Sequence, residues 1–176
     1  MAGKKHRSYL DDFQRDVNGE YQYRGAHYRY AGMMEYRTLR RSLWLCCGCG
    51  SALVLAAGCL PGATAGAAWY VTLPTMLALV ACGFLLWTLA RWTKGGMTLR
   101  AYVHARTVRR LPAEALIAAG MSAFGAVGQG ISLLFGNPAN WAKIGHFAAL
   151  AVASGFFIRT HVLVKRTVYD FIDANK

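Results

Sequence analysis

The residues that come closest to forming a metal-binding cluster are three cysteines in the run Cys46-Cys47-Gly48-Cys49. A structural zinc site needs four ligands within tetrahedral reach of the ion. Adjacent cysteines on a helix point about 100° apart, and the sequence places no clear fourth ligand beside them. We therefore expect no metal site and assign these cysteines to packing, with thiol lipidation or redox sensing as the alternative.

A polar pathway or a cofactor site would depend on His146 and Gln129, the only histidine and amide inside the long apolar segments. Proton-coupled transporters usually need a carboxylate or histidine relay at depth. A haem held by two histidines would need a partner at the depth of His146, which neither His104 nor His161 offers. We expect no cofactor. The alternatives are haem or quinone binding at His146, or a pathway lined by Ser122, Gln129 and His146.

Four long apolar segments must position these side chains. The chain is 55% hydrophobic and only 16% charged, and its apolar residues form long blocks. About 20 apolar residues in helix cross the hydrocarbon core, whereas helices of a soluble bundle need polar faces that these segments lack. The predicted fold class is an all-α integral membrane protein with four transmembrane helices, at about residues 42–60, 69–90, 115–135 and 141–158.

The basic residues predict how these helices are oriented. Every Lys and Arg except Lys143 lies in the segments 1–41, 91–114 and 159–176. Because short cytoplasmic segments carry an excess of Lys and Arg, we expect both termini and the middle loop to be cytoplasmic, in a bacterial cytoplasmic membrane. The net charge of +12 then reflects topology, and we expect no nucleic-acid partner.

A sequence repeat predicts that the four helices form two tandem hairpins. Residues 36–41 (YRTLRR) resemble residues 105–110 (ARTVRR), and each copy is followed by a pair of apolar segments. Trp69 or Trp141 opens the returning segment of each pair. Parallel repeats of this kind occur in transporters, and they also arise when a stable hairpin is duplicated.

Stripes of small residues predict where the helices pack. Residues four apart lie on one helix face, and small residues there let helices in lipid approach closely. We expect the stripes to pack helices within the chain, against another membrane protein, or against a second copy. They are Gly48, Ala52 and Ala56 in the first segment, Ala118, Ser122, Ala126 and Gly130 in the third, and Gly145, Ala149 and Ala153 in the fourth.

The cytoplasmic segments are basic and aromatic. The alternating runs 20–23 and 27–30 predict a small β-hairpin, residues 99–111 an amphipathic helix at the membrane surface, and residues 159–176 a cytoplasmic helix that continues the fourth span. The basic side chains are expected to contact anionic headgroups or a partner. They are Arg24, Arg29, Arg37, Arg40, Arg41, Arg106, Arg109 and Arg110.

These features favour a protein without catalysis of its own. No phosphate loop, nucleophile elbow or metalloprotease motif occurs in the sequence. The expected function is that of an accessory or assembly subunit that acts through helix packing and a basic cytoplasmic face. The alternatives are a small oligomeric transporter or channel, and a haem or quinone membrane anchor.

The topology has a direct test. Reporter domains fused at Gly62 and at Asn137 should be active only as external reporters, while a fusion at Gly96 should report the cytoplasm. Cytoplasmic activity at Gly62 or Asn137 would contradict the four-span orientation.

Overall fold

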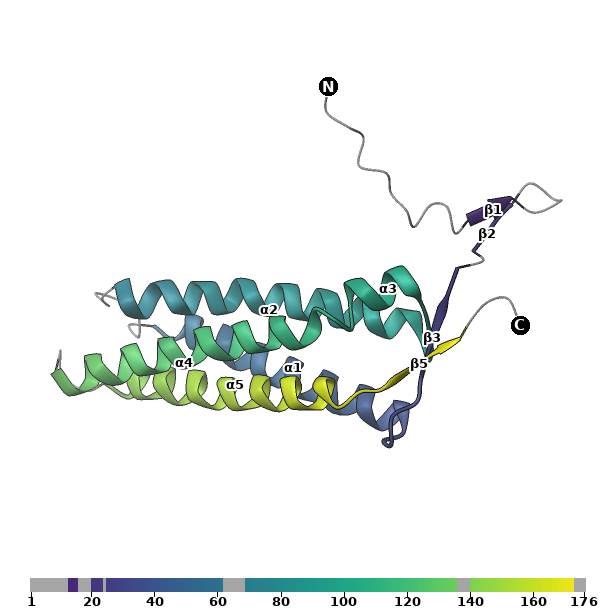
Figure 1. The fold of residues 1–176 in the computed structure, drawn as a ribbon. Coiled ribbons are helices and arrows are strands. Elements are labelled where there is room, and N and C mark those ends of the chain that lie inside the picture. The colour runs from purple at the N-terminus through teal and green to yellow at the C-terminus, as the bar shows by residue number, and fades with distance from the viewer. Residues whose placement is uncertain (1–12, 16–19, 24, 62–68, 136–139, 173–176) are drawn as a thin grey trace, which may run out of the picture.

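The structure is a computed structural model that describes residues 13–15, 20–23, 25–61, 69–135 and 140–172. Four long helices lie side by side, and short strands gather at one end of them (Figure 1). Four helices are long and apolar enough to cross a membrane, so the prediction of a mainly helical membrane protein is confirmed at this level. The long helices are α1 (Tyr36–Cys59), α2 (Trp69–Gly95), α4 (Leu111–Phe135) and α5 (Trp141–Lys165).

All four helices extend beyond their predicted apolar limits at the end that carries the strands. There α1 begins at Tyr36 and α4 at Leu111, while α2 continues to Gly95 and α5 to Lys165. Hydropathy marks only the part of a helix that lies in hydrocarbon, whereas Arg and Lys are good helix formers in water. The helices therefore continue until a residue with a non-helical backbone conformation ends them. Gly96, which directly follows α2, is such a residue and has a φ of 71°.

The helices pack so that α1 and α2 are the most loosely joined neighbours. The most extensive contacts join α4 to α5, followed by α2 to α4 and α1 to α5. Small side chains of α4 form the centre, because Ala115, Ala118, Ser122 and Ala126 are buried. The first helix thus packs chiefly on the last, rather than on the second helix of its predicted hairpin.

A three-stranded antiparallel sheet lies at one end of the bundle, which we call the sheet end. Its order is β4-β3-β5, and it joins the N-terminal, middle and C-terminal segments of the chain. Tyr28 at the centre of β3 is opposite Leu99 of β4 and Phe171 of β5. The strands are β3 (His27–Tyr30), β4 (Thr98–Arg100) and β5 (Tyr169–Ile172).

The predicted N-terminal hairpin is wrong in its pairing. The runs 20–23 and 27–30 do contain strands, but β2 (Tyr21–Tyr23) pairs with β1 (Phe13–Arg15), and β3 pairs with β4 and β5. Alternation within a short strand indicates which face each side chain takes. It does not indicate the partner, which for β3 comes from distant parts of the chain.

Two predicted helices at the sheet end are also corrected. The C-terminal segment is helical only to Lys165. The Thr167 hydroxyl donates a hydrogen bond to the carbonyl of Val164 in the last turn, at 2.7 Å. The residues that follow are mostly β-branched or aromatic and favour a strand. The segment 99–111 is not one amphipathic helix, because Leu99 is in β4 and α3 is only Ala101–Arg106. Tertiary pairing with β3 decides both outcomes.

The attachment of β5 to the bundle should depend on one hydrogen bond. Trp92 Nε1 of α2 donates to the Tyr169 hydroxyl at 2.7 Å, and Trp92 is 2% exposed. Tyr169→Phe should lower the free energy of unfolding in mild detergent by about 1 kcal/mol, because the buried indole N–H loses its acceptor. Tyr70→Phe, at the exposed start of α2, is the control and should leave stability unchanged; equal effects of the two variants would contradict this role.

Candidate functional site

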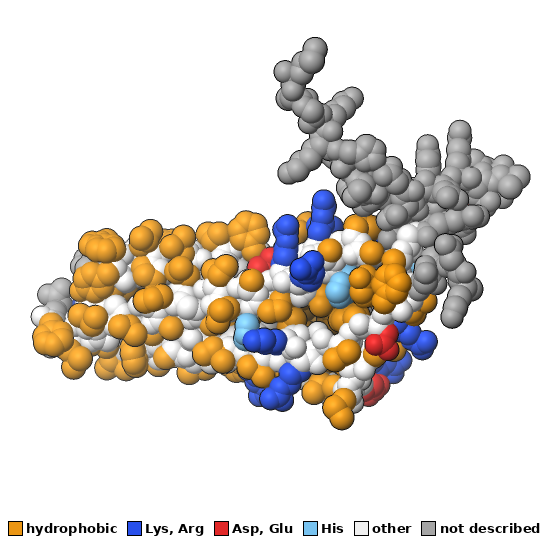
Figure 2. Space-filling view, viewed as in Figure 1, with side chains coloured by type: hydrophobic (Ala, Val, Ile, Leu, Met, Phe, Trp, Pro, Cys, Tyr) orange, Lys and Arg blue, Asp and Glu red, His pale blue; other side chains and the backbone are white. Residues whose placement is uncertain are grey.

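The sheet end gathers nearly all of the exposed positive charge. Figure 2 shows Lys and Arg side chains over the half of the molecule near the sheet, while hydrophobic side chains cover the opposite half. The predicted contact residues Arg29, Arg37, Arg40, Arg41, Arg106, Arg109 and Arg110 are all exposed there, and Arg24 lies outside the described residues. The structure thus presents these side chains on one surface, and whether they bind headgroups or a partner stays a prediction.

An aromatic cluster joins the sheet and the long helices at the sheet end into one packed platform. The rings of Tyr28 and His104 stack with centroids 4.2 Å apart, and His104 lies edge-on to Tyr169 at 5.1 Å. Tyr36 of α1 lies between Tyr30 of β3 and Trp92 of α2, at 5.8 and 5.4 Å. Aromatic pairs in such geometries add about 0.5–1.5 kcal/mol each beyond area burial. The cluster therefore joins the sheet to two of the long helices.

Burial in this cluster raises the pKa of the Tyr169 hydroxyl far above its ordinary value and that of Tyr30 to a smaller degree. Both hydroxyls therefore stay protonated at physiological pH. The Tyr30 hydroxyl donates to the carbonyl of Met34 at 2.8 Å. The sequence alone did not predict that Tyr28, Tyr30, Trp92, His104 and Tyr169 come together in one cluster. The available signal was that Tyr28 and Tyr30 alternate on one face of a strand.

A basic pocket lies between α2 and α4 at the border of the sheet end. Its volume is about 300 Å³. Successive main-chain hydrogen bonds around Thr107, from Thr107 N to Val103 O and from Leu111 N to Thr107 O, fold the chain between α3 and α4 into a tight turn. Arg106 and Arg110 from either side of this turn then face Arg91 of α2. The pocket is lined by Phe84, Trp87, Thr88, Arg91, Arg106, Thr107, Arg110 and Glu114.

Glu114 is the acidic member of the basic pocket and stands in the first turn of α4. Its Oε2 atom is buried and has no hydrogen-bond partner among the described residues. The positive end of the α4 helix dipole and the arginines of the pocket place positive charge around this carboxyl group. The pocket thus combines donors for an anion with one buried acceptor oxygen. From the sequence, Glu114 was recognisable only as a charge at the start of a span.

A buried polar trio lies inside the bundle, with Ser122 near the middle of α4 and with Gln129 and His146 farther from the sheet. Ser122 and Gln129 of α4 and His146 of α5 are all 0% exposed. Their side-chain nitrogen and oxygen atoms have no hydrogen-bond partner among the described residues. Gly125 faces Leu150, and Gly130 faces Phe147, so Gln129 and His146 lie at similar depth on antiparallel helices. Such groups raise the free energy of the interior unless a polar partner reaches them.

The small-residue stripes lie partly inside and partly outside the bundle. Ala118, Ser122, Ala126 and Ala153 are buried, and Gly48, Gly130, Gly145 and Ala149 are half-buried. Ala52 and Ala56 are exposed, so they do not pack α1 within the chain. The inward face of α1 instead carries Cys47, Gly50, Val54 and Ala57. Both faces of α1 contain small residues, and spacing by four cannot select between them.

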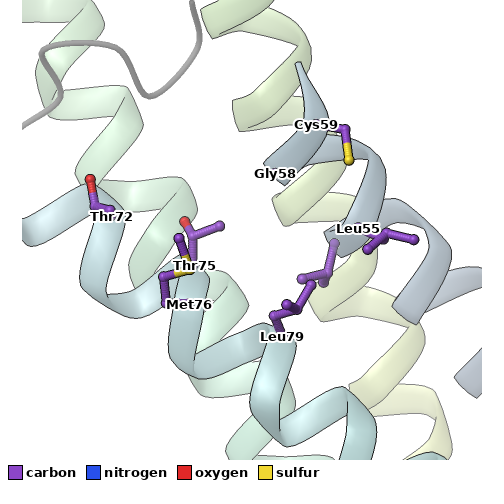
Figure 3. Close-up of a pocket in the computed structure, with 8 residues that line it drawn as sticks. Leu55, Gly58, Cys59, Thr72, Thr75, Met76 and Leu79 are labelled. Atoms are coloured by element: carbon purple, nitrogen blue, oxygen red, sulfur yellow. The ribbon is translucent and has the colours of Figure 1, made fainter. Parts of the chain in front are cut away.

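A small cleft between α1 and α2 opens where these helices are loosely joined. Its volume is about 200 Å³, and Leu55, Cys59, Thr72 and Met76 are among the side chains that line it (Figure 3). The hydroxyl of Thr75 at this cleft already donates to Val71 O at 2.8 Å. The lining is therefore mostly apolar and suited to a hydrocarbon chain, and it includes the thiol of the exposed Cys59.

Neither cysteines nor histidines assemble into a ligand set within the described residues, where no group of three or more His, Cys, Asp or Glu could hold a metal ion. Cys46 and Cys47 are buried and Cys49 is exposed. His161 lies at the other end of α5, with its Nδ1 2.8 Å from Pro112 O. His146 therefore has no second described histidine at its level, and the expected lack of a cofactor stays a prediction.

Comparison with known proteins provides no relative from which a function could be transferred. No family model, no curated protein and no solved structure matches the chain. The function must therefore be inferred from the sheet end, the basic pocket and the buried polar trio.

The close approach of α4 to α2 should depend on Gly128. A Cβ atom there would lie 2.7 Å from the main-chain oxygen of Tyr70, whereas one at Gly120 of the same helix would meet nothing within 4 Å. Gly128→Ala should lower the free energy of unfolding in detergent by about 1–3 kcal/mol through overpacking. Gly120→Ala should cause no loss. Equal stability of the two variants would contradict this packing.

Proposed function

We propose that the protein is a non-catalytic accessory or assembly subunit of a membrane complex, and that its sheet end docks a partner membrane protein. The observation that carries this proposal is the platform at the sheet end. Three separate segments of the chain converge there on one antiparallel sheet, although a bundle of membrane helices does not need such a sheet for its own insertion. A packed platform of this kind is suited to recognition.

Exposed apolar side chains on the platform support a docking role. Val168, Phe171 and Ile172 are 54%, 60% and 40% exposed, at or beside β5. Met97, which is 51% exposed, lies across β3 from them, because its carbonyl accepts from Tyr30 N while Val168 O accepts from Ala31 N. In water, several exposed apolar groups at one end of a protein mark interaction sites more often than single ones do.

The charge at the sheet end supports both the orientation and the kind of partner. Every described Lys and Arg except Lys143 lies toward this end, which by the positive-inside rule faces the cytoplasm. An acidic surface with an apolar centre complements a basic platform with exposed Phe171 and Val168. β5 is also an edge strand in the order β4-β3-β5, so an extended segment of the partner can add to it.

A second candidate function is a small oligomeric transporter, and the buried polar trio favours it. Unpartnered groups of Ser122, Gln129 and His146 inside an apolar bundle are typical of sites that contact a polar solute. All three side chains are 0% exposed inside one four-helix bundle, so a path that they line would run through the bundle of each copy in an oligomer. The two candidates therefore differ in the composition of the native complex.

Native mass spectrometry of the complex from its source membrane, in mild detergent, tests the proposal. The chain of 19.3 kDa should be found bound to a different protein. The double variant Val168→Asp/Phe171→Asp should release that protein while helical content is kept, because two charges would be buried in the docking surface. The control Lys143→Gln, at the opposite end, should not.

Two results would contradict the proposal. A lone chain of 19.3 kDa for both the unaltered protein and the control would exclude a stable partner. A mass at a multiple of that value, with no second protein, would favour the oligomeric transporter instead.

A further inference from the structure

We propose that the basic pocket is a binding site for an anionic phospholipid whose headgroup carries hydroxyl groups, such as phosphatidylglycerol. The phosphate lies among the arginines, and the acyl chains run along the exposed rings of Phe84 and Trp87. This inference rests on the orientation in the proposed function, which places the sheet end at the cytoplasmic leaflet.

The convergence of arginines indicates an anion with the chemistry of phosphate. Arg91, Arg106 and Arg110 come from α2, from α3 and from the residue before α4, and all three line one pocket. These three arginines share the pocket with a single acidic residue, Glu114, so the pocket keeps an excess of positive charge. The planar guanidinium group presents paired N–H donors that match phosphate oxygens. The ligand is therefore an anion held by several charge-assisted hydrogen bonds.

The arrangement of side chains along α2 indicates that this anion is part of an amphipathic molecule. Phe84, Trp87, Thr88 and Arg91 follow one another on a single helix face and span about 10 Å along the axis. Phe84 and Trp87 are 63% and 67% exposed within a helix long and apolar enough to cross the membrane. One end of the pocket thus meets hydrocarbon and the other end is cationic. A soluble phosphate compound would contact only the cationic end, whereas a phospholipid would contact both.

Glu114 narrows the choice of headgroup. Its buried Oε2 has no partner among the described residues, and a carboxylate in the pocket repels a bare phosphate monoester. A hydroxyl on the headgroup donates a hydrogen bond to the carboxyl group of Glu114 where this residue lines the pocket. Glycerol-type headgroups therefore fit the pocket better than phosphatidic acid or zwitterionic phosphatidylcholine.

Lipid binding to the purified full chain can be measured by native mass spectrometry in detergent. Short-chain phosphatidylglycerol should bind at least about tenfold more tightly than phosphatidylcholine with the same acyl chains. Arg91→Gln/Arg110→Gln should weaken phosphatidylglycerol binding by about tenfold or more, which corresponds to loss of a charge-assisted hydrogen bond. The control Arg41→Gln/Arg109→Gln removes two exposed arginines that do not line the pocket and should have little effect.

Two results would overturn the proposal, and a third would overturn the part of it that concerns the headgroup hydroxyl. An equal loss in both double variants would mean a diffuse charge effect. Competition by glycerol phosphate at the same concentration as the lipid would mean a site for a soluble anion. For Glu114→Gln, we expect the preference for phosphatidylglycerol over phosphatidic acid to fall, and an unchanged preference would remove the role of Glu114.

The outcome is separable from that of the docking proposal. Lipid binding is measured on the isolated chain, whereas docking is measured on the complex from its source membrane. The arginine variants lie on the α2–α4 side and the docking variants at β5. A failed lipid experiment with an intact complex would therefore reject only the lipid site, and the reverse result would reject only the docking role.

Discussion

The cost of placing an ionised side chain in hydrocarbon shapes every part of this protein. At the centre of a bilayer an Arg, Lys or Asp on a helix costs about 2.5–3.5 kcal/mol by insertion measurements. This cost keeps Lys and Arg out of the middle of each span, and all described ones except Lys143 lie toward the sheet end. The rest of each helix presents apolar residues outward and satisfies its backbone internally. The charged residues are left to fold in water, at one end.

That segregation explains why the sheet end has a structure of its own. The chain segments at the polar ends of the helices carry Tyr28, Tyr30, Trp92 and Tyr169, whose rings pack together and whose strands pair. Within the bundle the attraction is different, because lipid tails are as apolar as the helices. Close approach at Gly128 and the small interior face of α4 take the place of a large-residue core there.

The basic pocket shows how one set of residues combines topology with recognition. Arg106 and Arg110 were predicted from the sequence as headgroup or partner contacts, because basic residues beside a span meet anionic lipid. Their convergence with Arg91 and Glu114 was not predictable, since it depends on the turn around Thr107 and on the packing of α4 against α2. Ser122, Gln129 and His146 were likewise identified from the sequence as polar residues at depth. Their burial without hydrogen-bond partners depends on how α4 and α5 are rotated about their axes in the bundle, which the sequence does not show.

From the amino-acid sequence one obtains the four apolar helices, their approximate limits and the gathering of basic residues at one end. These properties follow from the residue types in stretches of about 20 consecutive residues, which is the number that a helix needs to cross a membrane. The pairing of β3 with β4 and β5, the end of α5 at Lys165 and the outward position of Ala52 and Ala56 were decided by folding. Each of them depends on contacts between residues far apart in the chain, and local patterns along one segment contain no information about such contacts.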